Sequence, residues 1–133
     1  MVLMVIGILL GAIGVFFVIF IGRIFLFSKT ARDYNIKGHI AWKLNRDKKA
    51  IKYFQKAIEL NSDDVNTYLF MGSSYVSTDK YEEAIQCFQK VIELEPFYPS
   101  TYYFMGLIYE KLGNQVKADE YYKTNEILSN KKF

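Results

Sequence analysis

From residue 31 onward, apolar residues return every three or four positions, which is the spacing of one face of an α-helix. A clear example at i, i+3, i+4 and i+7 is formed by Tyr68, Met71, Gly72 and Tyr75. No stretch shows the sustained apolar-polar alternation of a half-buried strand followed by a hairpin turn. The pattern predicts six helices, at residues 31–44, 47–60, 65–77, 81–94, 99–112 and 115–128.

These helices contain a sequence pattern that returns every 34 residues along the chain. Its glycines and alanines are small where two helix backbones approach closely, and its aromatic residues fill the wider gaps beside them. Asp79 with Glu82 is interpreted as a capping box that opens the fourth helix of this series, and Pro96 as the residue that ends it. The repeating positions are Tyr34, Gly38, Ala50 and Phe54, then Tyr68, Gly72, Tyr75, Ala84, Phe88 and Pro96, then Tyr102, Gly106, Tyr109, Ala118 and Tyr122.

This pattern resembles the tetratricopeptide repeat (TPR) over residues 31–130. The resemblance implies an all-α, right-handed solenoid of helix hairpins, with repeats at residues 31–64, 65–98 and 99–130. The first copy departs from the pattern at Lys37, where the other copies have Met71 and Met105. About three stacked copies are the usual minimum for a stable array, so the sequence predicts a short but independent repeat domain.

The amino-terminal segment is different in character, because residues 1–22 contain no charged side chain. As a helix these residues would reach roughly 33 Å, enough for a hydrocarbon core of roughly 30 Å. The segment is therefore interpreted as a transmembrane anchor at residues 1–27, followed by a junction at 28–30. A cleaved signal peptide is the alternative, but the apolar run is long for one and no small-x-small cleavage site follows. Residues 131–133 form a tail.

Charge near this segment predicts its orientation. Arg23, Lys29, Arg32 and Lys37 follow the apolar run, against Asp33 alone. The positive-inside tendency then predicts a single-pass membrane protein with its repeats in the cytoplasm, and an extracytoplasmic placement is the alternative. Glycines at residues 7, 11 and 14 are compatible with a helix-dimer face, so oligomerisation is left open.

Composition excludes several functions. Residues 29–58 contain nine lysines and arginines against two acids, whereas residues 59–130 contain five against twelve. The acidic part would repel phosphate, which argues against nucleic acid as a partner. His39 and Cys87 are the only residues of their types, so a histidine or thiolate metal site is not predicted. With no catalytic motif found, we predict no enzyme activity, no cofactor and no small-molecule substrate.

The TPR resemblance implies a concave surface, formed by the first helix of each pair, that binds a peptide or helix of a partner protein. Trp42 is the most suggestive residue there, because large aromatic residues commonly anchor interfaces. Phe70, Ser100 and Phe104 stand where a carboxylate clamp of this family would need polar or basic groups, so an apolar or mixed ligand is expected. The predicted groove residues are Asn35, His39, Trp42, Asn66, Leu69, Ser73, Tyr103 and Leu107.

The sequence thus predicts a membrane-anchored adaptor that binds a partner protein in its groove and helps to assemble a membrane-associated complex. The alternative is a structural or accessory subunit that assembles mainly through its amino-terminal helix. The two readings differ in which part of the chain makes the main contact with the partner.

Overall fold

The computed structural model describes the chain except for residues 28–29, 61–62 and 132–133, and except for the side chains of residues 5, 7, 9, 10 and 20–27 within the first helix. The described residues fold into helices and turns, without strands. In chain order the helices are α1 (Val2–Phe27), α2 (Ala31–Lys43), α3 (Asp47–Glu59), α4 (Val65–Ser77), α5 (Tyr81–Leu94), α6 (Pro99–Lys111) and α7 (Gln115–Asn130). The six helix predictions after residue 30 are confirmed, with small differences at the helix ends.

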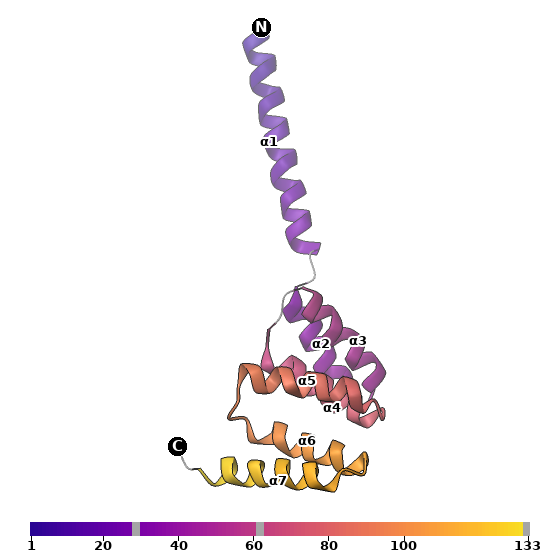
Figure 1. The fold of residues 1–133 in the computed structure, drawn as a ribbon. Helices are drawn as coiled ribbons and strands as arrows, with labels where there is room; N and C mark the ends of the chain where they lie inside the picture. The colour runs from indigo at the N-terminus through magenta and orange to yellow at the C-terminus, as the bar shows by residue number, and fades with distance from the viewer. Residues whose placement is uncertain (28–29, 61–62, 132–133) are drawn as a thin grey trace.

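Helices α2 to α7 form three antiparallel hairpins, α2–α3, α4–α5 and α6–α7, which stack on one another as a solenoid (Figure 1). Within each hairpin, a glycine of the first helix faces an aromatic ring of the second. A Cβ added to Gly38 would lie 2.5 Å from the Phe54 ring, and one added to Gly72 would lie 2.9 Å from the Phe88 ring. The backbones therefore approach as closely as the repeat pattern predicts.

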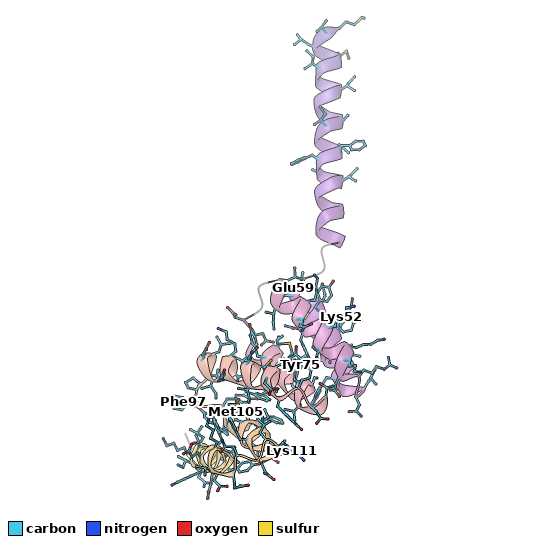
Figure 2. The ribbon with its side chains drawn as sticks, turned by 45° about the vertical axis from the view of Figure 1, so that its right-hand side comes forward. Lys52, Glu59, Tyr75, Phe97, Met105 and Lys111 are labelled. Carbon is cyan, nitrogen blue, oxygen red and sulfur yellow. The ribbon has the colours of Figure 1, made fainter. Side chains whose placement is uncertain are left out.

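The core follows the same repeating positions. Ala50, Ala84 and Ala118 are fully buried, as are the rings of Phe54 and Phe88. In Figure 2, Tyr75 and Met105 are labelled within the stacked helices, while Lys52 and Lys111 lie at their outer surface. A continuous apolar core of this kind is what allows hairpins that are individually unstable to support one another.

The turn inside each hairpin has a common conformation. Asn45, Asp79 and Gly113 occupy the same position of the three repeats, and all three have positive φ, at 52°, 57° and 76°. Asp79 is therefore the left-handed turn residue and not an N-cap. The helix cap of α5 is Lys80, which makes no side-chain capping bond, and the Asp79 carboxylate instead accepts a hydrogen bond of 2.8 Å from the Tyr81 hydroxyl. The predicted capping box of Asp79 with Glu82 is wrong.

Other helices do begin with a side-chain cap. Thr30 and Asp33 form a capping box at α2, with the Thr30 backbone N–H donating to the Asp33 carboxylate at 2.8 Å. This bond holds the pKa of Asp33 below its usual value, because it favours the charged carboxylate. Asp64 caps α4 and Asn114 caps α7. The Thr30 cap fixes where the chain enters the solenoid, and the Asp64 and Asn114 caps fix where α4 and α7 begin.

Helix α1 extends away from the hairpin stack in Figure 1 and packs against none of the other described helices. Its described apolar side chains are exposed and point outward around the helix in Figure 2. A membrane crossing needs about 20 consecutive, predominantly apolar residues. Within the part of the chain that the structure describes, no helix is both long enough and apolar enough for this, and the longest run of described side chains in α1 is residues 11–19.

This finding corrects two predictions. The amino-terminal transmembrane anchor at residues 1–27 is not supported, and the single-pass membrane placement with cytoplasmic repeats is wrong. Residues 28–29 of the predicted junction and 132–133 of the predicted tail lie outside the described residues, as do the side chains of Arg23 and of residue 7 in the glycine series.

Candidate protein-binding surface

The first helices of the three hairpins, α2, α4 and α6, lie side by side. Helix α2 contacts α4, and α4 contacts α6. Together they form one face of the solenoid, here called the A-helix face. Most of the predicted groove residues have exposed or half-exposed side chains on these helices: Asn35, His39, Trp42, Asn66, Ser73, Tyr103 and Leu107. The structure therefore brings residues from all three hairpins to one surface.

Leu69 is the exception among the predicted groove residues. Its side chain is 8% exposed and belongs to the apolar core, in contact with buried residues of the neighbouring helices. The rings that stand at the clamp positions, Phe70 and Phe104, are half-buried and pack against this core. Phe104 stacks on Phe88 with ring centroids 5.2 Å apart, so it packs between hairpins. These side chains shape the floor beneath the A-helix face.

A cluster of three rings joins the first two hairpins on the A-helix face. The centroid of His39 is 4.3 Å from that of Phe70, and Trp42 approaches the same ring at 4.6 Å, both in tilted, edge-on geometry. Such aromatic pairs are favourable beyond the area they bury. Trp42 thus packs on the next hairpin while part of its indole remains accessible. Phe70 was not predicted as a groove residue, although its recurrence as Phe104 at the same position of the next repeat is a signal in the sequence.

A polar contact lies next to this cluster. The fully buried Thr67 hydroxyl is 2.8 Å from Asn35 Oδ1 and 3.0 Å from Asp64 Oδ2, so its single proton has two acceptors. Asn35 therefore helps to hold α2 against α4. Asn66 is more exposed, and its backbone N–H donates to Asp64 at 3.4 Å. Buried polar groups that are paired in this way fix the register between neighbouring helices.

His39 has an electrostatic environment of its own. Its pKa lies below the ordinary value of 6.5, mainly because burial disfavours the charged imidazolium, with Lys43 adding to the effect and Asp64 opposing it. At neutral pH the ring is therefore an uncharged donor and acceptor. The A-helix face therefore carries aromatic rings and uncharged hydrogen-bonding groups, which include the side chains of Trp42, Ser73 and Tyr103. The Tyr103 side chain is 49% exposed.

A separate hollow of about 570 Å³ lies between α3, α4 and α5. Tyr75 lines it, and its hydroxyl accepts a hydrogen bond of 2.9 Å from Gln55 Nε2. Cys87 also lines it but is 5% exposed, and burial raises the pKa of its thiol to about 12, so the reactive thiolate is strongly disfavoured. Over the described residues, no group of three or more His, Cys, Asp and Glu side chains is placed to hold a metal ion.

Two family models match this chain. A model described as "Tetratricopeptide repeat" matches residues 31–64, and one described as "TPR repeat" matches residues 72–113. Together with the hairpin stack described above, these matches identify residues 31–64 and 72–113 as tetratricopeptide-repeat sequence. The sequence has no significant match among curated proteins.

Several solved structures are similar to the chain. A crystal structure of MamA is 28% identical, with a TM-score of 0.73 over 80% of this chain and 62% of that one. The second TPR of Spaghetti (RPAP3) bound to the HSP90 peptide SRMEEVD is 21% identical, with a TM-score of 0.69 over 75% of this chain and 93% of that one. PcrH in complex with the chaperone binding region of PopB is 19% identical, with a TM-score of 0.70 over 74% and 80%. The last two show a common fold, and the chain spans about three-fifths of the MamA structure.

Proposed function

We propose that this protein is a TPR adaptor that binds a peptide or helix of a partner protein on its A-helix face and so helps to assemble a protein complex. The observation that supports this most is the convergence of accessible aromatic and polar side chains from three hairpins, with Trp42 at one end and Tyr103 at the other. Large aromatic residues with a polar atom are the side chains that most often dominate interface energetics.

The chemistry of the surface favours a ligand of mixed, mainly apolar character. Phe70 and Phe104 fill the positions at which a carboxylate clamp would need polar groups, and both rings are packed against neighbouring helices. His39 is uncharged at neutral pH because its pKa is lowered. Two structural relatives were determined with a bound peptide or chaperone binding region, which is consistent with peptide binding by this fold.

The test begins with a display library of random peptides selected on the full-length protein. Binding of the selected peptides is then measured for three variants: Tyr103→Ala, Ser73→Glu, and Ile127→Glu on α7 as the control. Truncating a central interface residue typically costs more than about 1 kcal/mol of binding free energy, so Tyr103→Ala is expected to weaken binding roughly fivefold or more. Equal affinity for all three variants, with their helical circular dichroism unchanged, would exclude this surface as the peptide site.

A further inference from the structure

One face of α2 is apolar and uncovered. Ile36, Ile40 and Leu44 are spaced at i, i+4 and i+8, so they form a stripe along the helix. Their side chains are 51%, 55% and 57% exposed. Among the described helices α2 packs only against α3 and α4, which cover its other sides. A stripe of this length on a helix otherwise embedded in a solenoid requires an explanation.

The equivalent faces of the other two hairpins are each covered by the preceding helix. Helix α3 packs on α4, and α5 packs on α6. Ser74 and Ile108 occupy the position of Ile40 in the second and third hairpins, and both are fully buried. Phe104, which is equivalent to Ile36, stacks on Phe88 of α5. The position of Ile40 is therefore one that a preceding helix covers in the other two hairpins, whereas Leu112, the equivalent of Leu44, remains 46% exposed.

Charge distinguishes this face from the other two. Lys37 stands where Met71 and Met105 are buried by α3 and α5, at 7% and 0% exposure. The Lys37 ammonium lies 5.7 Å from the centroid of the Tyr34 ring and is exposed. A hollow of about 170 Å³ on this face is lined by apolar and aromatic side chains, here called its apolar floor, and by three cations, here called its basic rim. The floor consists of Ile40, Ala41, Leu44 and Tyr53, and the rim consists of Lys37, Arg46 and Lys49. The residues that line the hollow include no acid.

We propose that this face of α2 is a second docking surface, which binds an amphipathic helix of a partner protein with acidic residues beside its apolar stripe. The apolar floor would bury the stripe of the partner helix, and the three cations on the rim would select its acidic residues and accelerate association. This surface is formed by the outer side of the first hairpin and is independent of the A-helix face, because none of the proposed groove residues contributes to it.

Helix α1 of the same chain or of a second copy fits this surface less well. Residues 1–27 contain no aspartate or glutamate, so they would match the apolar floor and leave all three rim cations unpaired. In the structure α1 packs on no other described helix. Charge complementarity therefore favours a separate partner with acidic residues over either of these occupants.

The chain itself supplies a matched pair of probe peptides. Helix α5, which covers α6, has three glutamates against one lysine, whereas helix α3, which covers α4, has four lysines against two acids. Their apolar residues correspond position for position, as Ile85, Phe88 and Ile92 against Ile51, Phe54 and Ile58. Labelled peptides of residues 81–94, with Cys87→Ser, and of residues 47–59 are titrated with the full-length protein by fluorescence anisotropy. The acidic peptide is expected to bind at least about tenfold more tightly, and added salt is expected to reduce this difference.

Variants then locate the binding. Ile40→Glu is expected to abolish binding of the acidic peptide, whereas Ile127→Glu, at a similarly exposed position of α7, is expected to leave it unchanged. Lys37→Glu with Lys49→Glu is expected to reverse the preference between the two peptides. Tyr103→Ala is expected to have no effect, which separates this surface from the A-helix face.

Three results would overturn the proposal. Equal affinity for the two peptides would show that the cations of the basic rim do not select an acidic helix. Unchanged binding by Ile40→Glu would mean that the peptide binds elsewhere, for example by displacing α5 from α6. Self-association of the wild-type chain in sedimentation velocity that is lost in Ile40→Glu would make the face an interface between copies.

Discussion

At the scale of single residues, two equivalent threonines occupy different chemical environments. Thr67 and Thr101 share one position of the second and third repeats, and both are fully buried. Thr67 has Asn35 and Asp64 as hydrogen-bond partners, whereas the equivalent positions around Thr101 are Leu69 and Tyr98. Within the described structure the Thr101 hydroxyl has no partner. The repeat pattern preserved the residue in the third hairpin without the groups that satisfy it.

This difference predicts opposite effects of one substitution. Thr67→Val should lower the free energy of unfolding by about 1 kcal/mol, because it removes the hydroxyl that donates to the half-buried Asn35 and Asp64 side chains. Thr101→Val should raise it by up to about 1 kcal/mol, because it removes a buried hydroxyl whose desolvation is uncompensated. Chemical denaturation of the two variants measures both effects. A loss of stability of similar size in both variants would show that Thr101 is satisfied after all.

His39 provides a pH-dependent test on the same face. Its folded-state pKa is lowered, so the folded protein binds this proton less well than the unfolded chain does. The stability that depends on neutral His39 is therefore complete above the unfolded pKa of about 6.5 and decreases as the pH falls below it.

Because His39 is the only histidine, its ring protons can be followed directly by NMR. We expect a titration midpoint below 6.5. Lys43→Gln should raise this midpoint, since Lys43 lowers the pKa, and Asp64→Asn should lower it further, since Asp64 opposes the effect of burial. A midpoint at or above 6.5 in the folded wild type would contradict the burial of the ring against Phe70.

At the scale of elements, each hairpin depends on the contact between a glycine and a ring. Ala at Gly38 or Gly106 would place its Cβ 2.5 or 2.6 Å from Phe54 or Tyr122. The Phe54 ring is fully buried and has no room to move, whereas Tyr122 is half-buried on the terminal helix.

Gly38→Ala is therefore expected to lower the free energy of unfolding by about 1–3 kcal/mol despite the higher helix propensity of alanine. Gly106→Ala is expected to cost less, because Tyr122 can shift. Thermal unfolding compares the two variants, with Ser77→Ala at an exposed position as the control. A larger loss in Gly106→Ala would mean that the third hairpin is the more tightly packed.

The turns within the hairpins allow a second comparison at this scale. Left-handed backbone costs a non-glycine residue roughly 1 kcal/mol, and Asp79 adopts it with φ of 57°. Asp79→Gly should therefore leave stability unchanged or raise it slightly. Gly113→Ala, at φ of 76°, should lower it by about 1 kcal/mol, although a Cβ there would meet no atom within 4 Å. Urea titrations measure both, and an unchanged Gly113→Ala would refute the strain argument.

At the scale of the whole molecule, none of the described helices of the hairpin stack contacts α1. Because α1 packs against no other described helix, removal of residues 1–29 is expected to leave the stability of the stack unchanged. Thr30 is retained because it forms the capping box of α2 with Asp33. Thermal unfolding and amide hydrogen exchange of residues 31–130 test this. Loss of protection in α2 on truncation would reveal a contact between α1 and the first hairpin.

Much of the fold was predictable from the sequence, because a repeat makes each structural requirement visible more than once. The spacing of Gly38, Gly72 and Gly106 and the apolar periodicity located six helices and their pairing. The family assignment followed from the same positions, because a small residue is required wherever two helix backbones touch. The predicted anchor in the amino-terminal run is not supported, because the length of an uncharged segment in the sequence does not establish a membrane crossing.

The accessible residues of the candidate protein-binding surface were less predictable from the sequence than the fold was. Periodicity indicated which helices form the A-helix face, but it did not distinguish the accessible Tyr103 from the buried Leu69. It also gave no reason for Lys37 in place of methionine, which became clear once the face of α2 was found uncovered. The sequence determined local geometry, which recurs in every repeat. Burial depends on neighbouring hairpins, and these differ for the first, middle and last copy, so only the folded stack decided which equivalent residues are covered.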